Sequence, residues 1–123
     1  PIVVSQAPVS GSVIGIWGYG INQTDDDAGI FRTGAMEIVE VTPNHLISVF
    51  DGEQNTCFGD SGGPATLDIV DLNGQVIGVG VFGVTSFGST DNCARGELSF
   101  FTNLQSMDVL NFVLSVVPDA ALL

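Results

Sequence analysis

The stretch NTCFGDSGGPA, residues 55–65, decides the fold of this chain. It joins two apolar segments and holds a cysteine, a serine and, between positions 59 and 63, three glycines. Glycines at this density mark backbone that turns sharply or approaches another group closely. The serine among them, Ser61, is either an ordinary turn residue or a nucleophile presented on a tight loop.

Short apolar segments broken by glycine and asparagine lie on both sides of this loop and predict β-strands. An Asn-Gly dipeptide at positions 73 and 74 predicts a hairpin between two of them. Only residues 106–117 have helical spacing, with Ser106 as N-cap. The expected strands are residues 12–20, 35–42, 46–50 and 65–70, the hairpin segment 71–88, and residues 98–104. Six strands followed by one helix predict an all-β protein, a small antiparallel barrel.

Composition limits the classes of function. A chain of 123 residues with 45% hydrophobic residues is expected to form one small packed domain. Two basic residues against 14 acidic ones give a net charge of −12, which repels nucleic acid and anionic lipid. The longest apolar runs are broken by glycine and are too short to span a bilayer, so we expect no membrane partner. The first residues, PIVVSQAP, lack a basic region followed by an apolar one, and we expect any targeting signal to have been removed.

The two cysteines, Cys57 and Cys93, allow two interpretations. A lone pair in a small acidic chain is compatible with one disulfide and an oxidising compartment. The alternative is two unrelated buried thiols.

Three further features carry weaker signals. The acidic stretch TDDDAG, residues 24–29, lacks the alternating spacing of a calcium loop and is expected to be a solvated loop. Asn22 begins a glycosylation sequon, which has meaning only in a eukaryotic secretory pathway. The single histidine, His45, is expected to be a surface loop residue. We expect neither a metal site nor a cofactor.

Eight consecutive residues, CFGDSGGP at positions 57–64, resemble the nucleophile loop of the trypsin/chymotrypsin family of serine endopeptidases. The segments IWGYG, VTSFG and FFTNL resemble further family segments and occur in family order. The resemblance implies the second barrel of that fold, a six-stranded antiparallel Greek-key barrel with a C-terminal helix. Residues 11–123 would form this barrel, and residues 1–10 resemble the linker between the family's two barrels.

The resemblance also implies roles for the loop. Ser61 would be the nucleophile, and the N–H groups of Gly59 and Ser61 would form the oxyanion hole. Asp60 would accept the ammonium group produced by zymogen activation. Ser86 would hydrogen-bond the catalytic aspartate, and Gly88 would pair with extended substrate.

The implied specificity pocket includes Asn55, Thr56, Phe87 and Ser99. Asn55 stands where trypsin-like enzymes carry an aspartate, which disfavours a basic substrate side chain and favours an uncharged or aromatic one. Cys57 and Cys93 would be bonded, joining the nucleophile loop to the pocket edge.

The family's catalytic histidine and aspartate lie on a first barrel that has no equivalent in this sequence. We therefore expect the C-terminal half of a secreted serine endopeptidase, extracellular or periplasmic, that is inactive alone and acts on peptide substrates. An exposed apolar face should bind the N-terminal barrel or a second copy.

The alternative is a non-catalytic homologue that serves as a protein-interaction module. An esterase elbow fits less well because it needs a strand-turn-helix context, and Ser61 is followed by a strand pattern.

Overall fold

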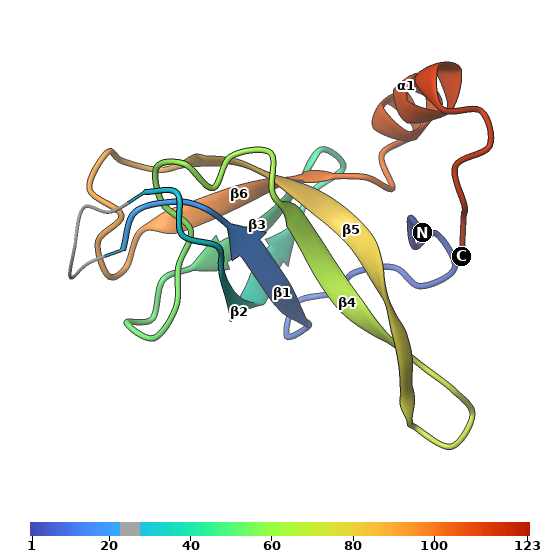
Figure 1. The fold of residues 1–123 in the computed structure, drawn as a ribbon, viewed down its shortest axis with the longest axis horizontal. Helices are drawn as coiled ribbons and strands as arrows, with labels where there is room; N and C mark the ends of the chain where they lie inside the picture. The colour runs from blue at the N-terminus through green and yellow to red at the C-terminus, as the bar shows by residue number, and fades with distance from the viewer. Residues whose placement is uncertain (23–27) are drawn as a thin grey trace.

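The computed structural model describes residues 1–22 and 28–123 (Figure 1). The elements along the chain are β1 (Val13–Gly18), β2 (Arg32–Val41), β3 (His45–Val49), β4 (Pro64–Val70), β5 (Val76–Gly88), β6 (Leu98–Asn103) and α1 (Met107–Val116). All six expected strands and the helix are therefore present. The largest difference is at β2, which begins three residues earlier than the alternation of its side chains indicates.

The strands close into a barrel in the order β1-β2-β3-β6-β5-β4, and every neighbouring pair is antiparallel. The expected six-stranded antiparallel barrel with a C-terminal helix is confirmed. Because β3 pairs with β6 and β4 pairs with β1, the connection from β3 to β4 crosses one end of the barrel. This connection contains the serine loop, which we define as residues 57–63.

The barrel interior is filled by alternate side chains of its strands, as expected when one face of each strand is buried. Phe82 and Phe101 are fully buried at its centre, together with Ile14, Ile38 and Leu46. The other buried members of this core are Val3, Ile16, Met36 and Ala65.

The N-terminal segment contributes to this core. The Val3 amide donates to the Val81 carbonyl at 3.1 Å, and the Val81 amide donates to the Pro1 carbonyl at 2.8 Å. The Val3 side chain is 5% exposed and occupies the space beside Gly80, where a Cβ would lie 2.1 Å from its Cγ2. The division into a linker at residues 1–10 and a barrel at residues 11–123 stays a prediction.

Strands β4 and β5 form the expected hairpin, which extends beyond the rest of the barrel in Figure 1. The Asp71 carboxylate accepts the amides of Asn73 and Gln75 at 2.8 and 2.9 Å. Gly74 has a φ of +78°, a conformation that glycine adopts without strain. The Asn-Gly turn therefore identified the hairpin correctly.

Helix α1 stands apart from the barrel in Figure 1, and none of its residues is buried. Ser106 occupies the N-cap position as expected, but its side chain makes no capping hydrogen bond. No helix in the described part of the chain is long and apolar enough to cross a membrane.

Candidate functional site

The serine loop is a series of tight turns attached to β5. The Asp60 amide donates to the Cys57 carbonyl at 3.1 Å, and the Gly63 amide donates to the Asp60 carbonyl at 3.0 Å. Gly59 and Gly62 have φ values of +96° and +86°, which explains the need for glycine at both positions. Thr85 of β5 accepts the Gly62 amide at 2.9 Å and donates its own amide to the Gly63 carbonyl at 2.8 Å.

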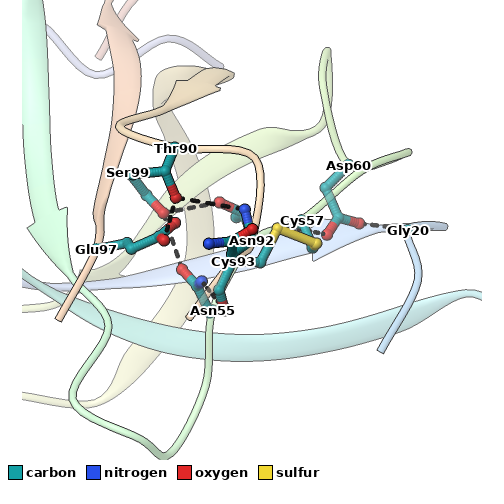
Figure 2. The surroundings of a disulfide bond; sticks show 10 residues. Gly20, Asn55, Cys57, Asp60, Thr90, Asn92, Cys93, Glu97 and Ser99 are labelled. Atoms are coloured by element: carbon teal, nitrogen blue, oxygen red, sulfur yellow. Dashed lines mark hydrogen bonds between the residues drawn. A yellow bond between two sulfur atoms is a disulfide. The ribbon is translucent and has the colours of Figure 1, made fainter. Parts of the chain in front are cut away.

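A disulfide joins Cys57 to Cys93, with 5.6 Å between the two Cα atoms. The interpretation as two separate thiols is therefore wrong. The bond ties the serine loop to the segment that precedes β6, 36 residues later in the chain (Figure 2).

The half-buried Asp60 carboxylate accepts two backbone N–H groups (Figure 2). Its Oδ1 lies 2.8 Å from the Gly20 amide nitrogen, and its Oδ2 lies 2.9 Å from the Cys57 amide nitrogen. A Cβ at Gly20 would lie 2.5 Å from the Asp60 Cγ, so the absence of a side chain there permits the contact. Asp60 thus links the serine loop to the chain after β1.

Arg32, at the start of β2, supports this link. Its guanidinium donates to the Gly20 carbonyl at 3.0 Å, while the Gly20 amide donates to Asp60. Sequence reasoning did not assign Arg32 to the site. The only available signal was that it is one of two basic residues in the chain.

Ser61 is exposed, and its hydroxyl donates to the Ser86 carbonyl at 3.3 Å. The amides of Gly59 and Ser61 donate no hydrogen bond to any residue that the structure describes, whereas the amides of Asp60, Gly62 and Gly63 all do. The two N–H groups on either side of Asp60 therefore have no acceptor within the described chain, although Gly59, unlike Ser61, does not line the cavity described next.

His45 is the first residue of β3 and is half-buried, so its expected place in a surface loop is wrong. Its ring makes edge contacts with the rings of Phe87 and Phe100, at centroid separations of 5.6 and 5.8 Å. The residue belongs to β3 because it pairs with Thr102 of β6, and its amide and carbonyl also hydrogen-bond to Thr42 in the turn from β2.

A cavity of about 240 Å³ opens beside Ser61. The hydroxyl of Thr56 donates to Ser99 at 3.0 Å, and the hydroxyl of Ser99 donates to the Asn55 Oδ1 at 2.8 Å. Every residue that the sequence indicated for substrate binding lines this cavity: Asn55, Thr56, Ser86, Phe87, Gly88 and Ser99. We call it the serine pocket.

Sequence reasoning did not assign several further residues of the serine pocket, among them Thr85 and Glu97. Thr85 directly precedes the recognised Ser86, and Glu97 lies two residues before Ser99. Neither residue has a signal of its own in the sequence, because only the closed barrel brings β5 and the segment before β6 to the same cavity.

A second cavity, of about 730 Å³, lies beside Asp60 and is lined by both arginines of the chain, Arg32 and Arg95.

Within residues 1–22 and 28–123, no group of His, Cys, Asp and Glu side chains is arranged to hold a metal ion. Most of the acidic stretch at residues 24–29, and the second and third residues of the sequon that begins at Asn22, lie outside the described residues.

Comparison with known proteins agrees with this geometry. The family model described as Trypsin matches residues 23–111, which include the serine loop, both cysteines and β2 to β6. A comparison with curated protein sequences found no match. With most of its length matched and a closed antiparallel barrel around the serine loop, the chain belongs to the trypsin family of serine proteases.

Proposed function

We propose that this chain is the catalytic-serine half of a secreted endopeptidase that hydrolyses peptide bonds through an acyl-enzyme. In this proposal the Ser61 hydroxyl attacks the scissile carbonyl, and the N–H groups of Gly59 and Ser61 stabilise the oxyanion. Asn55, Thr56 and Ser99 contact the substrate side chain that precedes the scissile bond, and Gly88 pairs with the substrate backbone.

The observation that carries the proposal is the hydrogen-bonding pattern of the serine loop. The amides at positions 60, 62 and 63 hold the loop together, while those at 59 and 61 have no partner in the described chain. One unused amide belongs to Ser61, whose exposed side chain lines the serine pocket, and the other belongs to Gly59, two residues earlier. An oxyanion hole needs donors that the fold itself does not occupy.

The general base would come from a companion barrel. A serine hydroxyl is a weak nucleophile without a base. The one histidine of the sequence packs against two phenylalanine rings, and the Ser61 hydroxyl has a carbonyl oxygen as its partner. We therefore propose that a histidine and an aspartate of a first barrel complete the triad, that Ser86 hydrogen-bonds this aspartate, and that the chain alone is inactive.

Asp60 would couple activity to proteolytic activation. Each carboxylate oxygen can accept a second hydrogen bond beyond the backbone amide that it already holds. The larger cavity beside Asp60 has space for an incoming ammonium group.

Secretion is supported by the disulfide, which persists in oxidising compartments.

The companion barrel would also cover apolar surface. Met107, Phe112 and Val116 of α1 are each at least 66% exposed. Exposed apolar patches often mark interfaces. We propose that this helix contributes to the contact with the N-terminal barrel, or with a second copy when that barrel is absent. Light scattering of the chain at rising concentration would contradict this if it showed a strict monomer.

The test of the function is covalent labelling of Ser61 by an organophosphonate. The protein that carries both barrels should be labelled at Ser61 and should lose peptidase activity, whereas its Ser61→Ala variant should not react. The 123-residue chain alone should react far more slowly, because it lacks the base. Peptide mass spectrometry locates the label.

Absence of both labelling and hydrolysis in the two-barrel protein would contradict the proposal. That result would favour the alternative, a non-catalytic homologue that binds other proteins through the same fold. Rapid labelling of the isolated chain would instead overturn the inference that its base lies elsewhere.

A further inference from the structure

The distal half of the hairpin formed by β4 and β5 has an exposed apolar face. Val70, Val76 and Val79 are between 49% and 59% exposed. The register pairs Val70 with Val76 and Asp68 with Val79, so these four side chains lie on one face of the hairpin. Ile77, which the register shift leaves without a partner, is 66% exposed. This part of the hairpin extends beyond the barrel (Figure 1).

Both edges of the distal hairpin lack a neighbouring strand. Strand β1 pairs with β4 only at Ala65 and Thr66, and β6 pairs with β5 from Gly83 onward. Within the described ranges 1–22 and 28–123, residues 67–70 and 76–80 therefore have only each other as strand partners. Unpaired peptide groups at the edge of a sheet can pair with a strand from another chain.

The β5 edge already accepts an added strand next to this free stretch. Residues 1–3 run parallel to β5, where the Val81 amide donates to the Pro1 carbonyl at 2.8 Å and the Val3 amide donates to the Val81 carbonyl at 3.1 Å. Peptide groups of alternate residues point to the same edge, and the register with β4 is regular from Val81 to Val79. The amide and carbonyl of Val79 therefore point to this edge as well, where no described residue pairs with them.

Charge distinguishes the two edges and indicates which partner fits. The β4 edge carries Asp68, whereas residues 76–82 of β5 carry no charged side chain. A cationic partner, which the net charge of −12 attracts, would find no carboxylate on the β5 edge. A second copy, which the same net charge repels, can approach closely only through a surface of this kind.

The position of Asp68 favours pairing through β5 and not through β4. Two β4 edges that met about a two-fold axis would bring the two Asp68 carboxylates close together, and like charges on adjacent strands are destabilising. When two β5 edges meet, three strand spacings separate the Asp68 strands, a distance of about 14 Å. This exceeds the Debye length of about 8 Å at physiological salt.

We propose that the β5 edge of the hairpin is a self-association site, at which residues 76–79 of two copies pair as antiparallel strands about a two-fold axis. The same edge serves both copies, and the peptide groups of Val79 gain partners. The exposed valines of both hairpins then form one apolar face of a four-stranded sheet. Because the paired segment is short, we expect a reversible dimer with a dissociation constant on the order of 100 μM.

Sedimentation equilibrium of the 123-residue chain between about 10 μM and 1 mM, at about 0.15 M salt, measures this association. Helix α1 is another proposed contact, so the measurement uses a Phe112→Ala background, which removes a phenylalanine that is 68% exposed. This background protein should still dimerise. Hydrogen exchange locates the contact: the Val79 amide should exchange more slowly at high concentration, whereas the Val81 amide, already bonded to Pro1, should not change.

Three variants in this background test the edge. Ile77→Lys should weaken dimerisation at least about tenfold, because lysine on an edge strand opposes strand addition. The matched control Val70→Lys adds the same charge at a similarly exposed position of β4 and should change the affinity less than about threefold. Val79→Pro removes the edge N–H, which the hairpin itself does not use, and should also weaken dimerisation at least about tenfold. Amide dispersion in NMR spectra shows that each variant is folded.

A background protein that stays monomeric at about 1 mM would overturn the inference. An equal loss of affinity in Val70→Lys would do so too, because the association would then respond only to charge. Unchanged affinity in Ile77→Lys or Val79→Pro would place the contact elsewhere, and slow exchange at Val79 at every concentration would mean that the chain itself covers the edge. None of these measurements involves Ser61, so this inference and the labelling test of the proposed function can fail independently.

Discussion

The serine loop and helix α1 are both peripheral to the barrel, but they are held in opposite ways. The loop is fixed by a disulfide, by two backbone hydrogen bonds to Thr85 and by the Asp60 carboxylate. The helix has no buried residue and no side-chain cap. The chain thus holds its candidate catalytic residues by its own contacts and leaves an apolar helix without cover. The barrel therefore organises the serine loop by itself, whereas in our proposal helix α1 is covered by a partner.

The largest expected effect is loss of the disulfide that fixes the loop. Replacing both cysteines, Cys57→Ser with Cys93→Ser, should lower the free energy of unfolding by about 4 kcal/mol, because the bond closes a loop with a sequence separation of 36 residues. Urea unfolding of the variant and of the reduced parent chain measures this, and both should agree. A decrease below about 1 kcal/mol would mean that the loop is held mainly by its hydrogen bonds.

The next effect distinguishes close packing from backbone strain within the loop. A Cβ at Gly63 would lie 2.1 Å from the Trp17 carbonyl oxygen, so Gly63→Ala should destabilise the protein by about 3 kcal/mol. The matched control is Gly62→Ala, where a Cβ meets nothing within 4 Å but φ is +86°, and the cost should be about 1–2 kcal/mol. Thermal unfolding compares the two variants. Equal effects would show that strain, and not contact with the backbone of β1, limits the loop.

Asp60 provides the third comparison. Asp60→Asn places an amide group against the donors of Gly20 and Cys57, so one backbone N–H loses its acceptor, at a cost of about 2 kcal/mol. Hydrogen exchange at these two amides should accelerate, while core amides such as that of Phe101 change only with global stability. The control, Asp68→Asn on the exposed surface of β4, should change stability by less than about 0.5 kcal/mol. Unchanged exchange at Gly20 and Cys57 would contradict the role of Asp60 as the link between them.

The smallest effect is expected in the helix. Phe112 is 68% exposed, and Phe112→Ala should change the stability of the chain by less than about 0.5 kcal/mol. The same substitution at the fully buried Phe101 should cost about 3–5 kcal/mol. Urea unfolding of both variants tests the contrast. A loss above about 1 kcal/mol at Phe112 would show that α1 packs against the barrel after all.

Much of this molecule follows from local sequence. The strand segments are visible because alternate side chains along a strand face the same side. The hairpin at Asn73 and Gly74 is visible because that dipeptide adopts the required turn without strain. The serine loop and its glycines, with Cys57, Asn55 and Ser99 around it, follow from a motif specific enough to indicate both the barrel and the site.

The tertiary structure decided the contacts between distant residues. Val3 enters the core beside Gly80, Arg32 supports Asp60 through Gly20, and His45 lies in a strand against two aromatic rings. Glu97 reaches the serine pocket from a segment that carries no motif for it, and Thr85 reaches it from the recognised segment VTSFG without having been assigned there. None of these contacts is encoded by local periodicity, because each depends on the register in which the strands close the barrel. The sequence therefore determined the elements and the reactive loop, and barrel closure determined which charges and hydroxyls surround it.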